Sequence, residues 1–530
     1  MYDTFDELFN RFEDHTKAFA KIGESRINRC RNDVLRQCKE KARLPPQMFT
    51  LTVPTGGGKT LSSMAFSLDH LKKNDLKRIF YVIPPYTSII EQNADVFRKI
   101  FGNHNVLEHH SNYDPKQRET EATDPVRESL TLSTENWDIP LVVTTNVQFF
   151  ESLFSNRRSK CRKIHNLSKS VIILDEAQML PIGYLKPCLA ALSELVLNYG
   201  STVVICTATQ PKIGSFLDER TKPLEIVDSP EELYETLRRV HVNNAGELDD
   251  EELSDRLRDL KQVLCIVNTR KHASSLFDTI SASEGSDGCF HLSAAMCPVH
   301  RRTILKEIRN RLKDGLPCRV ISTQLIEAGV DIDFPVVYRA MTGIDSVAQA
   351  AGRCNREGKS ERGEVYVFRS AEVYGKATSW QKRVAEIGEM IFNEYEDPPL
   401  SLDAVGRYFH KLYYYQGGND RLDKKGILQS LDERLDELAF PFEDVNDAFA
   451  IIENGTKDVV IPWDDDARFR IEKIRKNGFR KILAEGCRAT PLRSIHRYSG
   501  NWKNPELWIP LVNGFMFSRT CPCILKKPVL

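Results

Sequence analysis

Short apolar runs rich in β-branched residues recur along the first 370 residues of the chain, and longer amphipathic stretches separate them. Runs of this kind are typical of strands buried on both faces, and their alternation with helical stretches predicts parallel sheets covered by helices. The predicted strands are Phe49–Val53, Ile79–Ile83, Leu141–Thr145, Val171–Leu174, Val203–Cys206, Val263–Val267, Arg319–Ser322, Val336–Tyr338 and Val365–Phe368.

The predicted strands fall into two sets, and a polar, acidic stretch that includes Ser229–Glu232 separates them. We therefore predict an α/β protein with two tandem domains, residues 1–230, which begin with a helical segment, and residues 231–370. Amphipathic helical patterns then predict a helical linker over 371–460. From Trp463 the sequence becomes basic and aromatic, which predicts a small C-terminal domain over 461–530 that either guides a nucleic acid or carries a solvated charged helix.

Composition restricts the class of protein without deciding its function. Hydrophobic residues make up 41% and charged residues 28% of the 530 residues, which is typical of a folded protein of several domains. The 74 basic and 74 acidic residues cancel, so any nucleic-acid site must be local. No uncharged apolar run is long enough to span a membrane, which predicts a cytoplasmic protein with no membrane partner.

The strongest local motif is Val-Pro-Thr-Gly-Gly-Gly-Lys-Thr at residues 53–60, where a predicted strand gives way to a helix. Glycines there let backbone amides surround phosphate oxygens, and the N-terminus of the following helix attracts negative charge. Lys59 would reach the β- and γ-phosphates, and the Thr60 hydroxyl would bind Mg²⁺. The general pattern has Gly where this chain has Val53. The predicted nucleotide-binding residues are Pro54, Thr55, Gly56, Gly57, Gly58, Lys59 and Thr60.

An acidic pair, Asp175 and Glu176, follows the apolar run Val171–Leu174 directly. The carboxyl ends of parallel strands form the edge at which ligands bind. Asp175 is therefore predicted to hold the Mg²⁺ ion, and Glu176 to orient or deprotonate the water that attacks the γ-phosphate.

Three further motifs accompany the P-loop and the acidic pair, which opens the segment Asp-Glu-Ala-Gln at 175–178. They are Cys206–Thr209 (Cys-Thr-Ala-Thr), Ser322–Asp331 (Ser-Thr-Gln-Leu-Ile-Glu-Ala-Gly-Val-Asp) and Gln349–Arg356 (Gln-Ala-Ala-Gly-Arg-Cys-Asn-Arg). In order and spacing the five motifs resemble motifs I, II, III, V and VI of superfamily 2 helicases. This resemblance implies two tandem RecA-like domains with parallel sheets, and ATP and Mg²⁺ as cofactors.

Three more segments narrow the resemblance. Phe80–Gln92, Leu107–Asn112 and Val143–Glu151 are similar to the CRISPR-associated helicase-nucleases of type I systems, and all the matches together cover roughly residues 25–370. The resemblance implies an ATP-driven motor that moves 3′-to-5′ along single-stranded DNA in antiviral interference. It also implies recruitment by a Cascade-type crRNA-guided complex.

The sequence departs from that family in its nuclease. Most members carry an HD-type metal nuclease domain ahead of the motor, whereas about 50 residues precede this P-loop and none of the twelve histidines is followed by Asp. We therefore expect no nuclease activity from this polypeptide. The HD nuclease would be a separate chain, or would have been removed from this one.

The resemblance assigns roles to residues of the second predicted domain. Arg353 and Arg356 are three residues apart, which predicts that they share one helical face and point together across the interdomain cleft toward the γ-phosphate. Gln349 would contact phosphate or the coupling network. Gly329 would allow a close-approach turn, and Asp331 would bind the nucleotide ribose or pair with an arginine.

Coupling residues are also expected in the first predicted domain. Gln178 would connect the phosphate site to the facing domain. Thr207 and Thr209 would relay the state of the nucleotide to the DNA surface, or would simply cap a strand end. Gln37, about 17 residues before Pro54, would either read adenine or lie on the surface of a helix.

The predicted DNA surface consists of small hydrogen-bonding residues at strand ends, which suit phosphate contacts without base readout. His109 and His110 would lie near this path or would be buried structural histidines. Each candidate is also an ordinary turn residue. The candidates are Pro84, Thr87, Thr144, Thr145, Asn268, Thr269, Thr323 and Gln324.

Two other functions stay open at this point. One is a motor of the same superfamily that acts on RNA, or in DNA restriction or repair. The other is a nucleotide-gated DNA clamp that does not hydrolyse ATP, although the presence of Lys59, Glu176, Arg353 and Arg356 argues against it.

Overall fold

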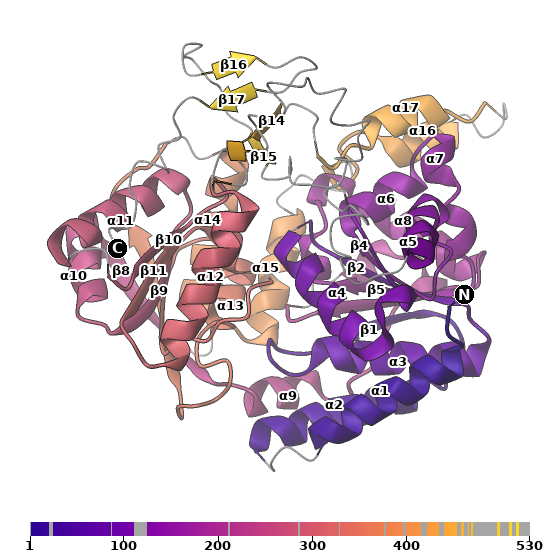
Figure 1. The fold of residues 1–530 in the computed structure, drawn as a ribbon, viewed down its shortest axis with the longest axis horizontal. Helices are drawn as coiled ribbons and strands as arrows, with labels where there is room; N and C mark the ends of the chain where they lie inside the picture. Colours follow the sequence, from indigo (N-terminus) through magenta and orange to yellow (C-terminus); the bar gives the residue numbers. More distant parts are fainter. Residues whose placement is uncertain are drawn as a thin grey trace.

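The computed structural model describes most of the chain up to residue 452 and short pieces beyond it. The described residues are 2–20, 25–85, 87–110, 124–209, 213–284, 287–327, 329–375, 378–395, 399–414, 421–433, 439–452, 457–460, 465, 468–469, 495–498, 508–510 and 516–518. Most of the predicted C-terminal domain therefore lies outside the described residues. Two α/β domains lie side by side, and the short strands of the C-terminal region lie above them in Figure 1.

The first sheet has seven strands in the order β3-β4-β2-β5-β6-β1-β7, and every pair of neighbours is parallel. Its central strands are buried at almost every position, because helices cover both faces. Alternate residues of one strand enter different cores: Tyr81 packs on one side of the sheet and Phe80 on the other. The strands are β1 (Met48–Thr52), β2 (Arg78–Ile83), β3 (Val106–His109), β4 (Leu141–Thr145), β5 (Ser170–Asp175), β6 (Thr202–Thr207) and β7 (Leu224–Glu225).

Nine helices accompany the first sheet in the described residues. The first two lie along its lower edge in Figure 1, where α2 packs on α3. The helices are α1 (Phe5–Ala20), α2 (Arg26–Lys41), α3 (Lys59–Asn74), α4 (Thr87–Phe101), α5 (Asp124–Asn136), α6 (Asn146–Leu153), α7 (Arg158–Cys161), α8 (Leu185–Leu197) and α9 (Pro230–Thr236).

The second sheet has six strands in the order β10-β11-β9-β12-β13-β8, again with all neighbours parallel. Its strands are β8 (Val240–Leu248), β9 (Gln262–Ile266), β10 (Cys289–Leu292), β11 (Cys318–Ser322), β12 (Val336–Ala340) and β13 (Gly363–Ser370). Its helices are α10 (Asp250–Arg258), α11 (Arg270–Glu284), α12 (Pro298–Lys313) and α13 (Ile344–Ala351). Short 3-10 helices occur in both domains. They are η1 (Asn103–Asn105), η2 (Ile164–Leu167), η3 (Ala177–Met179), η4 (Ile182–Tyr184), η5 (Ile213–Phe216), η6 (Glu219–Thr221) and η7 (Gln324–Ile326).

Helices that follow the second sheet return to the first domain. The helices α14 (Ser379–Glu394) and α15 (Leu402–Tyr414) pack on α13, whereas α16 (Ile427–Glu433) packs on α8, and α17 (Phe442–Ala448) lies beside it (Figure 1). The rings of Phe154 and Phe449 stack with centroids 4.2 Å apart, which fixes the end of this segment to the first domain. A four-stranded sheet follows, built from β14 (Lys457–Val460), β15 (Ile495–Tyr498), β16 (Trp508–Pro510) and β17 (Met516–Ser518).

The predicted α/β fold is confirmed, and all nine predicted strands are present with ends shifted by at most a few residues. Four strands of the two parallel sheets were not predicted, namely β3, β7, β8 and β10. β8 is an edge strand with a half-exposed, polar sequence, and β3 contains the buried Glu108, so neither gives a continuous apolar run. In the part of the chain that the structure describes, no helix combines the length and apolarity that a membrane crossing requires.

Candidate nucleotide site between the two domains

The P-loop lies between the end of β1 and the first residue of α3, Lys59. Gly56 and Gly58 have φ angles of 82° and 89°, in the left-handed region that side chains disfavour. The amide of Gly57 donates to the carbonyl of Pro54 at 2.9 Å, which closes a tight turn. The sequence thus folds locally into a loop that directs backbone amides and a helix N-terminus at one point, a geometry suited to phosphate.

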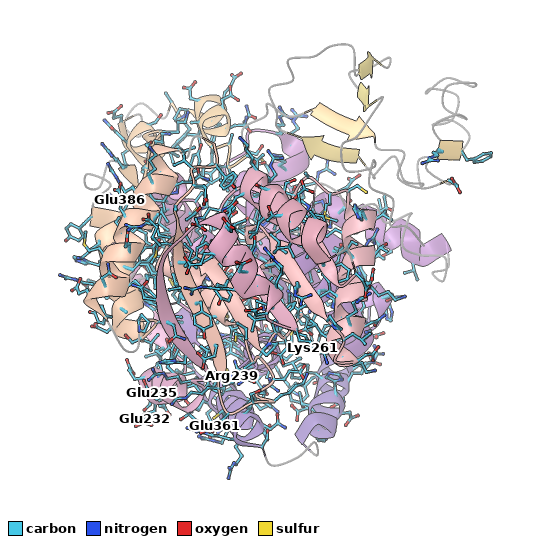
Figure 2. The ribbon with its side chains drawn as sticks, turned by 90° about the vertical axis from the view of Figure 1, so that its left-hand side faces the viewer. Glu232, Glu235, Arg239, Lys261, Glu361 and Glu386 are labelled. Carbon is cyan, nitrogen blue, oxygen red and sulfur yellow. The ribbon has the colours of Figure 1, made fainter. Side chains whose placement is uncertain are left out.

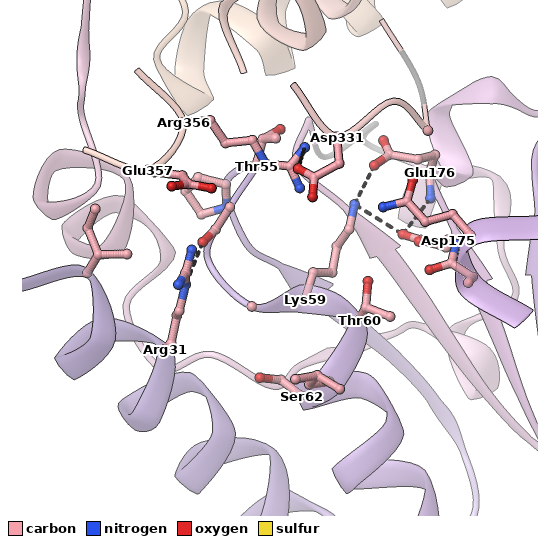
Figure 3. A pocket seen from close by; sticks show the side chains of 18 of the residues that line it. Arg31, Thr55, Lys59, Thr60, Ser62, Asp175, Glu176, Asp331, Arg356 and Glu357 are labelled. Atoms are coloured by element: carbon pink, nitrogen blue, oxygen red, sulfur yellow. Dashed lines mark hydrogen bonds and ion pairs between the residues drawn. The ribbon is translucent and has the colours of Figure 1, made fainter. Parts of the chain in front are cut away.

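Lys59 meets the acidic pair in a buried cluster (Figure 3). Its Nζ lies 2.7 Å from Oε1 of Glu176 and 3.1 Å from Oδ1 of Asp175, and the Lys59 and Asp175 side chains are 11% and 8% exposed. Burial lowers the pKa of Lys59, but the two carboxylates outweigh burial and raise it. Burial acts to raise the pKa of both carboxyl groups, and the Lys59 ammonium acts to lower it. At Glu176 the ammonium outweighs burial and the pKa is lowered, whereas at Asp175 burial outweighs the ammonium and the pKa is raised. Lys59 is therefore a firmly charged cation at this site.

Asp175 is held by two further hydrogen bonds. The hydroxyl of Tyr81 donates to its Oδ2 at 2.9 Å, and the amide of Glu176 donates to its Oδ1 at 3.0 Å. The carboxylate of Asp175 and the hydroxyl of Thr60 line the same cavity, and both are the hard oxygen donors that Mg²⁺ prefers. The donor set therefore fits this ion.

Glu176 stands in a conformation that few non-glycine residues adopt, with φ 52° and ψ 48°. Its Oε2 accepts a hydrogen bond from Nε2 of Gln178 at 2.5 Å, and Oε1 of Gln178 accepts one from the Thr207 hydroxyl at 2.6 Å. The amide of Thr209 in turn donates to Thr207 Oγ1 at 2.9 Å. A continuous chain of hydrogen bonds thus runs from Lys59 to the end of β6.

A cavity of about 670 Å³ lies between the two domains and brings together most of the predicted site residues. Gly57 does not line it, and Gln178 reaches it only through Glu176. The predicted residues that do line it are Pro54, Thr55, Gly56, Gly58, Lys59, Thr60, Asp175, Glu176, Gly329, Asp331, Gln349, Arg353 and Arg356.

The two arginines lie beyond the end of α13, which stops at Ala351. The prediction that they share one helical face is therefore wrong: Gly352 ends the helix, and Asn355 turns the chain with a φ of 45°. Both nevertheless face the cavity. Arg353 is 6% exposed and donates from Nε to the Ile326 carbonyl at 3.1 Å, while Arg356 pairs with Asp331 at 3.2 Å.

Burial, together with repulsion from Arg356, lowers the pKa of Arg353 to about 10, whereas the facing carboxylate of Glu176 acts in the opposite direction. Arg353 is still charged at neutral pH. Glu176 of the first domain and Arg353 of the second therefore interact across the cleft.

Gln349 offers an unused hydrogen-bond donor. Its side chain is 8% exposed and lines the cavity, and its Nε2 is buried with no hydrogen-bond partner among the described residues. Leaving a buried donor unpaired costs about 1–3 kcal/mol. A phosphate oxygen or a water in the cavity would satisfy it.

Gly329 allows the two domains to approach closely. Its φ is 69°, and a Cβ at this position would overlap the side chain of Ile89 on α4 of the first domain. Gly352 makes a similar approach, since its Cβ would lie 2.8 Å from Cγ2 of Thr55 in the P-loop. The second domain thus touches the first at two glycines, one on each side of the cavity.

We expect Gly329→Ala to impair nucleotide turnover because the added methyl group pushes Ile89 and the second domain away. Gly315→Ala is the matched control: its φ is 65°, so the backbone strain is similar, yet nothing lies within 4 Å of the added Cβ. Both variants should lose about 1 kcal/mol of stability through the left-handed conformation. Steady-state ATPase kinetics should show a loss in Gly329→Ala alone, and equal rates in the two variants would contradict the close contact.

The predicted DNA-contacting residues lie at strand ends of both sheets, and none of the eight lines the cavity. Thr145 caps α6 by accepting from the Gln148 amide, and Thr269 accepts from the His272 amide. Thr144 donates to the His109 carbonyl at 2.7 Å, and Asn268 donates to the Met341 carbonyl at 2.8 Å. Pro84 and Thr323 are buried, Gln324 is half-buried, and the side chain of Thr87 lies outside the described residues. Their contact with DNA stays a prediction.

Of the three residues with two interpretations, His110 and Gln37 have buried side chains and His109 is half-buried. His109 accepts from the Trp137 indole at 2.8 Å, and His110 lies 2.9 Å from Glu108, which favours the structural interpretation of both histidines. Gln37 does not lie on a helix surface: it is 7% exposed, because it binds Asp33 through Nε2 and the Asp228 amide through Oε1. Both ends of the Gln37 amide are thus engaged within the protein, and its contact with adenine stays a prediction.

Arg31 and Tyr81 lie near the site and were not candidates in the sequence analysis. Arg31 on α2 donates to the carbonyl of Gly56 at 2.9 Å, and Tyr81 on β2 binds Asp175. Neither belongs to a recognisable motif. Tyr81 reads as one more apolar position of a buried strand, and Arg31 as a polar position of an amphipathic helix.

In the described residues, no group of three or more His, Cys, Asp or Glu side chains is placed to hold a metal ion, as a nuclease-type metal centre would require. The expectation that this polypeptide does not cut DNA stays a prediction.

Two family models match the chain. The model described as "DEAD/DEAH box helicase" matches residues 32–215, which include the P-loop and the acidic pair. The model described as "CRISPR-associated nuclease/helicase Cas3, C-terminal" matches residues 259–359, which include the two arginines.

Similar proteins carry the same description. A CRISPR-associated nuclease/helicase Cas3 of Haloferax volcanii is 27% identical over 445 residues, which cover 62% of this chain and 47% of the relative. Another, of Methanothermobacter thermautotrophicus, is 26% identical over 384 residues, covering 66% of this chain and 44% of the relative. The chain thus spans about half the length of the curated relatives it matches.

Solved structures agree in fold. The crystal structure of T. fusca Cas3 with ATP superposes with a TM-score of 0.57 at 17% identity, covering 81% of this chain and 58% of that one. The crystal structure of a CRISPR-associated protein gives a TM-score of 0.54 at 15% identity, covering 81% and 59%. The predicted pair of RecA-like domains is confirmed by this likeness and by the two parallel sheets. Motif order, domain architecture and both family matches support one identification, a superfamily 2 helicase similar to the CRISPR-associated nuclease/helicases.

Proposed function

We propose that this chain is an ATP-driven motor that moves 3′-to-5′ along single-stranded DNA in type I CRISPR antiviral interference. The observation that carries the proposal is the composition of the interdomain cavity. The first domain contributes Lys59, Asp175 and Glu176, and the second contributes Arg353 and Arg356. Hydrolysis at such a site requires both domains, so it is coupled to their relative movement.

ATP would bind with its β- and γ-phosphates on the P-loop. Lys59 then exchanges part of its contact with Glu176 and Asp175 for phosphate oxygens, which frees the Glu176 carboxylate to orient the attacking water. Thr60 and Asp175 would hold Mg²⁺, which when bound neutralises charge on the phosphates. The buried donor of Gln349 is placed to contact the γ-phosphate or that water.

Arg353 and Arg356 would stabilise the negative charge that develops on the transferred phosphoryl group. Because both belong to the second domain, they serve only while the cleft is closed. The hydrogen bonds from Glu176 through Gln178 to Thr207 offer a route by which the state of the nucleotide reaches the carboxyl end of β6. DNA contacts at neighbouring strand ends would sense that state.

The assignment to CRISPR interference is supported by the two relatives given above, which are described as CRISPR-associated nuclease/helicases. By that relationship we propose that a Cascade-type crRNA-guided complex recruits this motor to a displaced DNA strand. An HD nuclease on a separate chain would then cut the strand that the motor delivers.

The proposal is tested by asking which nucleic acid accelerates ATP hydrolysis. Purified protein is mixed with ATP, Mg²⁺ and one of three polymers of equal length: single-stranded DNA, duplex DNA or RNA. We expect single-stranded DNA to give the largest increase in turnover. A strand-displacement assay with 3′- and 5′-overhangs then measures the direction of movement.

Each other outcome identifies a different function. Stimulation by RNA alone would indicate an RNA motor, and stimulation by duplex DNA alone would favour restriction or repair. Tight ATP-dependent DNA binding without any turnover would indicate a clamp. Any of the three would overturn the proposal.

A further inference from the structure

Arg239 lies where the chain passes from the first domain to the second. It follows α9 and precedes β8, the edge strand of the second sheet. Leu233 of α9 and Leu237, the residue that caps its C-terminus, belong to the core of the first domain. Figure 2 shows it in the lower part of the molecule, in the same region as Glu235 and Glu361. It was not a candidate on sequence grounds, because it belongs to none of the motifs.

The second domain fixes the backbone of Arg239. Its carbonyl accepts hydrogen bonds from the amide of Gly363 at 2.9 Å and from Nδ2 of Asn355 at 3.1 Å. Gly363 begins β13, and Asn355 belongs to the turn between Arg353 and Arg356. The residue is therefore held directly against the turn that carries the two cavity arginines.

The side chain of Arg239 connects that turn to the P-loop. Its Nη1 donates to the carbonyl of Arg356 and its Nη2 to the carbonyl of Thr55. A Cβ at Gly56 would lie 2.8 Å from Nη2, so the guanidinium passes directly over the glycine of the loop. One planar group thus bonds to both domains at the nucleotide site.

Two other arginines, Arg31 and Arg356, lie close enough to Arg239 to repel its charge. Burial, followed by repulsion from Arg31 and Arg356, lowers the pKa of Arg239 to about 10. No ion pair to a carboxylate is present for Arg239 within the described residues, whereas Arg356 has Asp331. Phosphate groups on the P-loop would relieve this repulsion, so nucleotide binding favours the arrangement in which the three guanidinium groups are close together.

We propose that Arg239 is a positioning residue, which ties the P-loop to the turn of Arg353 and Arg356 and so makes hydrolysis depend on closure of the domains. The inference rests on the proposed ATPase and deepens it. Arg239 does not line the nucleotide cavity, so it acts through the residues it holds. Lysine cannot replace it, because a single ammonium group does not span two carbonyls as a planar guanidinium does.

The test compares Arg239→Ala and Arg239→Lys with Arg220→Ala, an exposed arginine whose partner Asp218 is also at the surface. DNA-stimulated kcat and KM, nucleotide affinity and thermal midpoint are measured for each. We expect kcat to fall about tenfold to a hundredfold in both Arg239 variants, which is the loss expected when catalytic groups are displaced by about 1 Å. Nucleotide affinity and thermal midpoint should stay close to wild type. The Arg220 variant should match wild type.

Hydrogen exchange gives a readout that does not require turnover. With a non-hydrolysable ATP analogue bound, amides of residues 352–358 should exchange faster in both Arg239 variants than in wild type. Wild-type kcat and exchange in Arg239→Ala would overturn the inference, and so would parallel losses of nucleotide affinity and thermal midpoint, which indicate a structural role. Wild-type protein without ATPase activity would instead refute the proposed function, and the exchange comparison would still decide the role of Arg239.

Discussion

Lys59→Ala is expected to abolish ATP turnover. The side chain is the only Lys or Arg in the described residues that pairs with both Asp175 and Glu176, and it is the group placed to bind the β- and γ-phosphates. Without it the phosphates lose their main countercharge, and a loss of about 10²-fold or more in kcat is the usual cost of removing such an electrostatic contact. The change is measured as ATP hydrolysed per second in the presence of single-stranded DNA.

The fold should persist in this variant, because Lys59 projects from a loop that its own backbone bonds and glycines shape. Circular dichroism and the thermal midpoint check this point. Lys222→Ala is the matched control, since Lys222 is half exposed and pairs with the exposed Glu219 at the surface. DNA-stimulated turnover of Lys59→Ala at the wild-type rate would show that the nucleotide site lies elsewhere.

Glu176→Gln should bind ATP and Mg²⁺ but hydrolyse ATP very slowly. The substitution keeps the shape of the side chain and removes the negative charge that orients or deprotonates the attacking water. General-base catalysis contributes about 10²–10⁴-fold, so kcat should fall by at least the lower of these factors. The stalled protein should stay closed on DNA, which is measured as slow dissociation from single-stranded DNA in the presence of ATP.

Glu219→Gln, an equivalent change at an exposed position, serves as the control and should behave as wild type. If Glu176→Gln loses its affinity for ATP, the carboxylate has a different role. Weaker nucleotide binding would then point to its contact with Lys59 as the function that matters.

Prediction from sequence succeeded where one local pattern determines the structure. Val171–Leu174 is apolar at every position because β5 is buried on both faces, and Asp175 follows it because the strand ends at the cavity. The glycines of the P-loop were recognisable for a similar reason, since the backbone needs left-handed φ angles at Gly56 and Gly58. The fold class and most cavity residues follow from such segments.

Prediction was limited where distant segments meet. The spacing of Arg353 and Arg356 suggested a shared helical face, but helix α13 ends before them, and their position depends on Asn355 and on contacts with Ile326 and Asp331.

Arg239 and Arg31 bond to backbone carbonyls, which no side-chain motif records. The sequence suggested that Gln37 is a surface residue, but in the folded chain the segment near Asp228 lies against it and bonds to its side chain. These features arise only when the tertiary structure forms.

The return of the chain from the second domain to the first has a mechanical consequence. The amide of Lys186 donates to the carbonyl of Leu422, and the amide of Lys424 to that of Gly183, so the segment after α15 is bonded to the first domain. The chain therefore passes between the two domains at two separate places, here and near Arg239. Two connections of this kind leave one domain free to rotate about the axis that joins them, and they oppose other rotations and sliding of one domain along the other. We therefore expect the relative motion of the two domains to follow mainly one rotation, as in hinge-type domain closure.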